Sequence, residues 1–207
     1  MKIETIDVGP QKWATKNLNL QTFQNGDEIP LVEDAEQWLQ FAAEGKPACC
    51  LYDNSKSMAK YGLLYNGFAI VDPRGLAPEG FRIPTVEDIL ALAAFMGHER
   101  STEHDLPYFK ELGTHLKSTK LWKKEFYSFP GDDKTGLNFL PSGYRTPKDA
   151  AFLDKGRSSD LWLSGEIRRT TKDVPVLWSF NLATYTKDLG VNSRDCRYGG
   201  PVRLIAI

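Results

Sequence analysis

The chain has 207 residues, of which 41% are hydrophobic and 26% are charged, and its formal net charge is -1. A chain of this length buries roughly 70% of its unfolded surface, so a core forms without disulfides or metals. The near-neutral charge provides no basic field for nucleic acid or for an anionic membrane. No stretch reaches the about 18 continuous apolar residues of a transmembrane helix. We therefore expect neither nucleic acid nor membrane insertion.

The N-terminus and the cysteines bear on the compartment. Residues 1–8 lack the basic and apolar regions of a signal peptide. We expect the chain as written to be cytoplasmic, or secreted or displayed at the cell surface if a leader was removed. Cys49, Cys50 and Cys196 do not make an even disulfide framework. We expect free thiols, with a bridge from Cys196 to one of the adjacent pair as the alternative.

The first half of the chain predicts short strands and one early helix. Residues 1–20 predict two strands, and the Asn-Gly-Asp sequence at residues 25–27 predicts a tight turn. Apolar residues spaced three and four apart predict a helix over residues 32–44. The apolar run at residues 48–52 predicts a further short strand.

Residues 61–84 are the stretch around which we expect the chain to be organised. Residues 60–71 are apolar and predict strand, helix or both, with Gly67 disfavouring helix. Two prolines and two glycines in residues 72–80 predict a shaped turn. The stretch leads directly into a predicted helix.

Thr85 and Asp88 predict the start of that helix. Their spacing of three is that of a capping box, with Asp in place of Glu, and the apolar periodicity continues to Met96. Residues 106–112 are a second short helix candidate, closed by Gly113.

Beyond Gly113 the pattern shifts toward the period of two that is typical of strands. Residues 131–136 and 187–190 predict loops or turns between the apolar segments. The strand candidates are residues 126–129, 137–144, 160–166, 176–184 and 200–207. Helices followed by antiparallel strands predict the α+β class. With no repeat and no linker, we expect a single domain over residues 1–207.

Short motifs follow one another in order along nearly the whole chain. They are PQKWATKNL at 10–18, YDN at 52–54, KYGLLYN at 60–66, DPRGLAPEGFRIPT at 72–85, LKST at 116–119, LPSGYR at 140–145, LWLSGE at 161–166 and PVR at 201–203. In this order they resemble the Fibrobacter succinogenes major paralogous domain, a family common in surface and secreted proteins of Bacteroidetes and relatives. The family's biochemical function is largely unassigned.

The resemblance implies a C-type-lectin-like fold, with a twisted antiparallel sheet flanked by two main helices. Relatives in this fold include formylglycine-generating enzymes and retroelement-diversified receptor-binding proteins. Many family members have Cys where this chain has Ala77 and Leu204, and the loss of both agrees with a reducing compartment. The residue before Arg82, often Trp, is Phe81 here. We expect Arg82 to be a buried or half-buried structural contact.

The motifs of enzyme chemistry are weak. The oxidase relatives need a redox-active or copper-binding Cys pair, whereas two cysteines here are adjacent and the third stands alone. His98, His104 and His115 lack metal-site spacing, and neither a phosphate loop nor a nucleophile elbow occurs. We expect a non-enzymatic protein without a catalytic residue or cofactor.

A metal site is not expected either. Sugar-binding C-type lectins hold Ca²⁺ with Glu-Pro-Asn or Gln-Pro-Asp and Trp-Asn-Asp sequences, and these tripeptides do not occur here. Asp132, Asp133 and Asp188 remain candidates for a structural cation.

The resemblance points to the segment from Trp178 to Tyr198 as a binding face, because diversified relatives vary this region. Its polar and aromatic groups suit adaptable contacts. The alternative is that they form the solvated face of two hairpins. The candidate binding residues are Trp178, Ser179, Asn181, Tyr185, Lys187, Asn192, Arg194, Arg197 and Tyr198. A basic cluster at Lys117, Lys120, Lys123 and Lys124 is expected to be a solvated face.

We therefore expect a ligand- or protein-binding module whose C-terminal strands and loops meet an unknown protein or glycan, with homo-oligomer formation left open. The first alternative is a structural subunit of a cell-surface or phage-like assembly. The second is an oxidase related to the formylglycine-generating enzymes.

Overall fold

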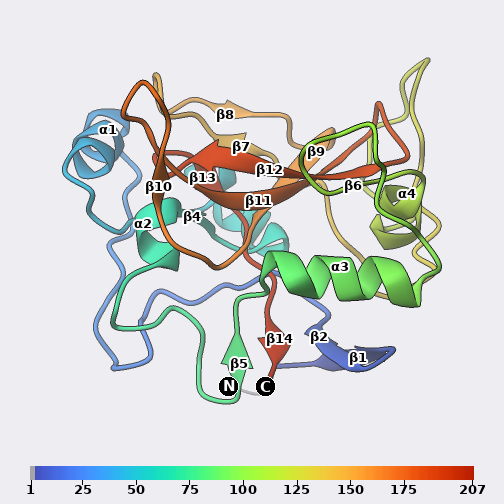
Figure 1. Ribbon diagram of the computed structural model, residues 1–207. Coiled ribbons are helices and arrows are strands. Elements are labelled where there is room, and N and C mark those ends of the chain that lie inside the picture. Colours follow the sequence, from blue (N-terminus) through green and yellow to red (C-terminus); the bar gives the residue numbers. More distant parts are fainter. Residues whose placement is uncertain (1–2) are drawn as a thin grey trace.

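Short antiparallel strands and a few helices make up the computed structural model, which describes residues 3–207 (Figure 1). The fold is therefore mixed and rich in sheet, as the sequence predicts. None of the helices in residues 3–207 is long and apolar enough to cross a membrane.

The first sheet joins the two ends of the chain. Its strand order is β1 (Thr5–Val8), β2 (Gln11–Ala14), β14 (Ile205–Ala206) and β5 (Phe81–Arg82). The two early strands confirm the prediction for residues 1–20. Since β14 pairs with both β2 and β5, the C-terminal strand connects the N-terminal hairpin to the end of the stretch at residues 61–84.

The second sheet carries the longest strands. Its order is β10 (Arg168–Arg169), β11 (Pro175–Ala183), β12 (Leu189–Asp195) and β6 (Tyr108–Phe109), and β9 (Ser158–Trp162) also pairs with β11. Helix α3 (Val86–Phe95) lies along one face of β11 and β12 (Figure 1). The largest buried apolar cluster fills the space between them.

The third sheet has the order β3 (Cys49–Cys50), β4 (Leu64–Asn66), β13 (Gly199–Gly200), β7 (Tyr144–Arg145) and β8 (Phe152–Leu153). Helix α1 (Ala35–Ala43) packs beside it through Trp38. Asp34 caps α1 by accepting a hydrogen bond from the Gln37 amide at 2.8 Å, so the helix begins three residues later than predicted.

The stretch at residues 60–71 contains both strand and helix. A 3₁₀ helix (Lys56–Tyr61), which follows another at Tyr52–Asn54, leads into β4 and then into the short α2 (Gly67–Ile70). Gly67 begins α2 although its propensity is poor, because a Cβ there would lie 2.7 Å from the Cα of Cys196. The close packing against Cys196 therefore requires a glycine at residue 67, despite its low helix propensity.

Two sequence predictions around Gly113 are wrong. Tyr108 and Phe109 form β6 against β12, since Gly190 and Leu189 offer free edge positions. The helix follows later as α4 (Leu112–Leu116), with Gly113 inside it rather than at its end. A Cβ on Gly113 would lie 2.3 Å from the Asp188 carbonyl oxygen, so the glycine permits a close approach.

The strand predictions for the second half match β9 and β11, but they miss β12 and are wrong for several loops. Residues 126–129 form a turn followed by irregular backbone, without a ladder partner in the described part of the chain, and they leave Phe126 and Tyr127 92% and 77% exposed. Residues 137–144 give only an isolated bridge at Phe139 and the start of β7. Pairing partners, not the apolar run itself, decide whether such segments become strands.

Three buried cations hold irregular segments together by binding backbone carbonyls. Arg145 and Arg203 donate to backbone carbonyls that are mostly distant in sequence, and each guanidinium lies against at least one aromatic ring. The Lys117 ammonium donates to the carbonyls of Phe129, Ala183 and Thr186 at 2.7–2.9 Å. The expectation that Lys117 lies on a solvated basic face is wrong, because its side chain is fully buried.

Candidate functional site

The structure does not bring the nine candidate binding residues together on one surface. Side chains alternate along β11, so Trp178 and Phe180 face the apolar core beneath α3. The Arg168 guanidinium lies 3.5 Å from the centre of the Trp178 ring. Ser179 points to the opposite face and is fully buried. Neither Trp178 nor Ser179 shares the surface of the remaining candidates.

Asn181, Asn192 and Arg194 lie on the face opposite α3. The register pairs Ser179 with Asn192 and Leu177 with Arg194, which sets their side chains beside that of Asn181. Tyr185 follows β11 in the loop to β12 and is 69% exposed. Asn181, Asn192 and Arg194 therefore lie together on one face of the sheet.

Tyr185 lines three adjoining hollows of about 220, 400 and 690 Å³, which we call the Tyr185 groove. The smallest hollow shares Asn181 and Tyr185 with the middle one, and Tyr108 and Asp188 line both larger hollows. The groove thus crosses β9, β11, β12 and β6 and their loops.

The innermost hollow contains a buried ion pair. Asp160 is 2% exposed, and its Oδ1 lies 2.5 Å from Nη2 of Arg194 and accepts a hydrogen bond from Asn181 Nδ2 at 3.0 Å. The Arg194 guanidinium also lies over the Tyr198 and Tyr144 rings, at 4.7 and 5.5 Å from their centres. Contacts with residues of β9 and β7, and with Tyr198, therefore fix the position of the Arg194 guanidinium.

Burial is the largest influence on the pKa values of Asp160 and Tyr144, which line this hollow. It raises the pKa of Asp160, although Arg194 and Asn181 act in the opposite direction. Burial, together with the nearby Asp154 carboxylate, raises the pKa of Tyr144 to about 12. The Tyr144 hydroxyl therefore stays protonated at neutral pH and is a hydrogen-bond donor.

The outer part of the groove is organised by Asp188. Its carboxylate accepts hydrogen bonds from the Tyr108 hydroxyl at 2.5 Å and from the Glu111 amide at 2.8 Å. Burial acts against ionisation of Asp188, but these donors prevail and lower its pKa. The His104 ring stacks on Tyr108 with centres 4.2 Å apart. An ionised carboxylate thus lies beside two aromatic rings.

The loop at residues 119–130 borders the groove. Glu125 and Phe129 line its hollows, and the Phe129 amide donates to the Thr184 carbonyl at 2.7 Å. This loop and the loop between β11 and β12 project on the same side of the molecule (Figure 1). The buried Lys117 ammonium donates to one carbonyl in each of these two loops, which fixes the position of the loop that carries Tyr185.

Lys187, Arg197 and Tyr198 have structural partners. Lys187 pairs with Glu111 at 3.3 Å at the edge of the groove. Arg197 pairs with Asp195 at 2.6 Å away from it. Tyr198 lies against Arg194 and the second apolar cluster.

A family model for the Fibrobacter succinogenes major domain matches residues 6–205. The chain belongs to this family. No curated protein and no solved structure matches it. The match confirms the family that the sequence motifs predict.

In this Fibrobacter succinogenes major domain, sequence reasoning missed Asp160, Asp188, Tyr108 and Tyr144 as members of the site. Asp160 gives one usable signal, since it is a charge between Ser159 and Leu161 in a strand that is otherwise neutral. From the sequence, Asp188 is considered only as a candidate for a structural cation. Tyr108 and Tyr144 carry no signal, because they come from short strands whose pairing with β12 and β13 is not visible locally.

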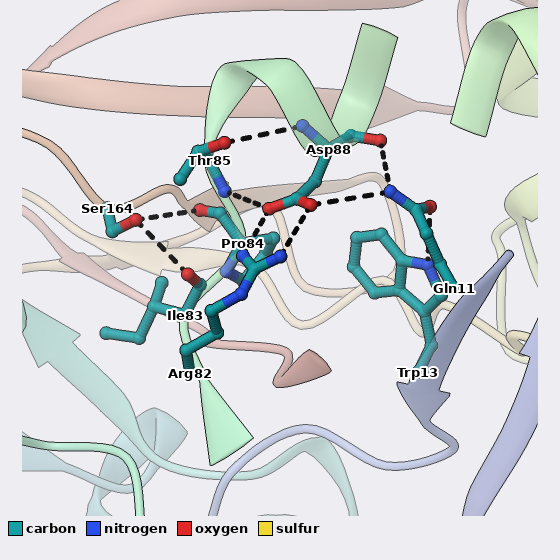
Figure 2. A network of polar contacts seen from close by, with 8 residues as sticks. All are labelled: Gln11, Trp13, Arg82, Ile83, Pro84, Thr85, Asp88 and Ser164. Carbon is teal, nitrogen blue, oxygen red and sulfur yellow. Dashed lines mark hydrogen bonds and ion pairs between the residues drawn. The ribbon is translucent and has the colours of Figure 1, made fainter. Parts of the chain in front are cut away.

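Other polar clusters of the domain are occupied by structural contacts. Figure 2 shows Asp88 bound by Arg82, by the Thr85 amide and by Gln11, while Ser164 donates to the Ile83 carbonyl. Arg82 is therefore the half-buried structural contact that the sequence predicts. A hollow of about 250 Å³ beside β2 is mainly apolar, and its Lys16 and Glu4 pair with each other at 2.8 Å.

The candidate cation and redox residues of the domain are dispersed. Asp132 contacts the His115 ring at 2.9 Å, and Asp133 accepts from the Asn138 amide at 2.7 Å. Within residues 3–207 no three metal-ligating side chains gather. The three cysteines are free and buried, and burial raises the pKa of each thiol to about 12.

Proposed function

We propose that this domain is a non-enzymatic binding module that meets a protein or glycan ligand at the Tyr185 groove. The observation that carries the proposal is the position of Tyr185, a largely exposed aromatic ring where three hollows meet. Tyrosine supplies a large contact area at little cost in side-chain entropy, which is why it is enriched at binding surfaces.

The border of the groove supports the same function. Phe126 and Tyr127 form an exposed edge-to-face pair with ring centres 4.7 Å apart, in the loop between the groove residues Glu125 and Phe129. Large apolar side chains exposed together are typical of interaction sites. A ligand lying across the groove would bury these rings as well as Tyr185.

The thiols and the buried acid favour binding over catalysis. A thiol with a pKa near 12 is protonated at neutral pH and is a poor nucleophile or redox group. Asp160 already holds Arg194 and Asn181 in place, so its carboxylate has a positioning role.

We further propose that the fold is C-type-lectin-like, as the family resemblance implies. Support comes from the antiparallel sheets, from the pairing of N- and C-terminal strands through β2 and β14, and from the main helices α1 and α3. In that fold the groove would occupy the region that receptor-binding relatives vary.

A glycan and protein array probed with the domain tests this function. We expect any ligand found to be lost by a Tyr185→Ala, Asn192→Ala variant and retained by Tyr185→Phe, which keeps the ring. The folded state of each variant is checked by circular dichroism. A ligand that the double variant still binds with unchanged affinity would overturn the proposal, and so would an array without any ligand. A stable oligomer that does not dissociate on dilution would favour the structural-subunit role instead.

A further inference from the structure

We infer that the ligand of the Tyr185 groove is a basic polypeptide segment, a stretch of a partner protein that carries lysine or arginine. This inference rests on the proposed function and adds the chemical class of the partner.

The charge of the groove is acidic after its own ion pairs are formed. Each lysine and arginine of the groove lies within 4 Å of an acid of the groove; the pairs are Lys110 with Glu103, Lys187 with Glu111, Arg157 with Glu125, and Arg194 with Asp160. Within residues 3–207 no lysine or arginine nitrogen lies within 4 Å of the carboxylate oxygens of Asp105, Asp154 or Asp188, although Arg100 donates to the backbone carbonyl of Asp105 at 2.7 Å and the charge of Lys110 acts to lower the pKa of Asp188. The groove therefore presents carboxylates without a cationic partner, and these attract cations.

Two polar atoms in the innermost hollow lack the partners that a peptide group supplies. The Ser158 hydroxyl is buried, lines this hollow and has no hydrogen-bond partner among the described residues. The same holds for Nε of Arg194. Buried polar groups are ordinarily hydrogen-bonded. Both atoms lie beneath the surface of the hollow, so a peptide N–H reaches the hydroxyl oxygen, and a peptide carbonyl reaches Nε, only when the lining side chains move aside.

Aromatic rings stand next to the unpaired acids. Tyr108 donates to Asp188, His104 stacks on Tyr108, and Tyr185 lines the same two hollows. A cationic head group gains from a nearby ring face as well as from a carboxylate. The long aliphatic stems of lysine and arginine pack on such rings. An anionic ligand would find carboxylates here instead.

The test uses an array of immobilised random-sequence peptides graded from acidic to basic, beside the glycan array. The probes are the wild-type domain, Asp105→Lys and the control Glu79→Lys, which makes the same charge change in the loop before β5. Glu79 is exposed and remote from the groove, and Asp105 makes no side-chain hydrogen bond in the described structure. We expect signal to rise with positive peptide charge and to fall with added salt.

For Asp105→Lys we expect a loss of affinity on the order of tenfold for the basic peptides, about 1.4 kcal/mol. Glu79→Lys should bind as the wild type does. Peptide binding without a charge preference, equal binding by Asp105→Lys, or binding to glycans alone would overturn this inference and leave the proposed function standing. Binding to neither array would overturn both.

Discussion

Lys117, Arg145 and Arg203 show what single residues contribute to a chain with so much irregular backbone. A guanidinium or ammonium group offers several donors, and here these donors bind carbonyls of segments that lie far apart in sequence. Burial lowers the pKa of Lys117 to about 8 and that of Arg203 to about 9. At neutral pH both remain charged and hold their loops.

Lys117→Met is expected to destabilise the domain by at least about 3 kcal/mol. The variant removes the ammonium donor from three carbonyls, one in a buried and two in partly buried contacts, and each orphaned acceptor costs on the order of 1 kcal/mol or more. Chemical denaturation measures the change in the free energy of unfolding. The matched control is Lys120→Met, at an exposed position, which should change it by less than about 0.5 kcal/mol. Equal stability of the two variants would contradict the role of Lys117.

At the scale of elements, α3 is set by the polar network that Figure 2 shows. Thr85 and Asp88 form the capping box, and Arg82 and Gln11 bind the same carboxylate from β5 and β2. Burial acts to raise the pKa of Asp88, but Arg82 and the Thr85 amide outweigh it, so the pKa is lower than its ordinary value of 3.8. The helix start and the first sheet are therefore joined through one ionised side chain.

Asp88→Asn is expected to cost about 1–2 kcal/mol of unfolding free energy at neutral pH. Since the carboxyl has a lower pKa in the folded state than in the unfolded state, its contribution is complete above about pH 4 and is lost as the pH falls through the folded value. The difference between wild type and variant should accordingly shrink toward strong acid. Denaturation at a series of pH values measures it, with Glu99→Gln as the control. A difference that stays constant down to strong acid would refute this account.

The same elements show how much of the fold could be predicted from the sequence. The α1 and α3 helices have long apolar periodicity and local caps, and the sequence predicts both. Strands of two residues, such as β6, form because a distant edge is available, and no local pattern records that edge. In the candidate site, too, residues with a local sequence signal differ from residues that join through distant pairing. Tyr185, Asn192 and Arg194 lie in the one segment, residues 178–198, that the resemblance singles out, whereas Asp160 and Tyr144 join them only through the pairing of β9 with β11 and of β7 with β13.

At the scale of the whole molecule, the groove is built from loops that a rigid sheet supports. The α3 side of β11 and β12 is filled by the apolar core, which leaves the opposite side for polar groups. Residues from four distant segments, around positions 105, 125, 160 and 190, meet there. Such loops on a fixed scaffold are where proteins ordinarily carry binding function.

Hydroxyl-radical footprinting of the domain, with and without the ligand obtained from the arrays, tests the central claim most directly. The exposed aromatic rings of Tyr185 and Phe95 report on the groove and on the α3 surface of the same molecule. We predict that the ligand protects Tyr185 from oxidation and leaves Phe95 as reactive as before. Protection of Phe95 with Tyr185 unchanged would contradict the account.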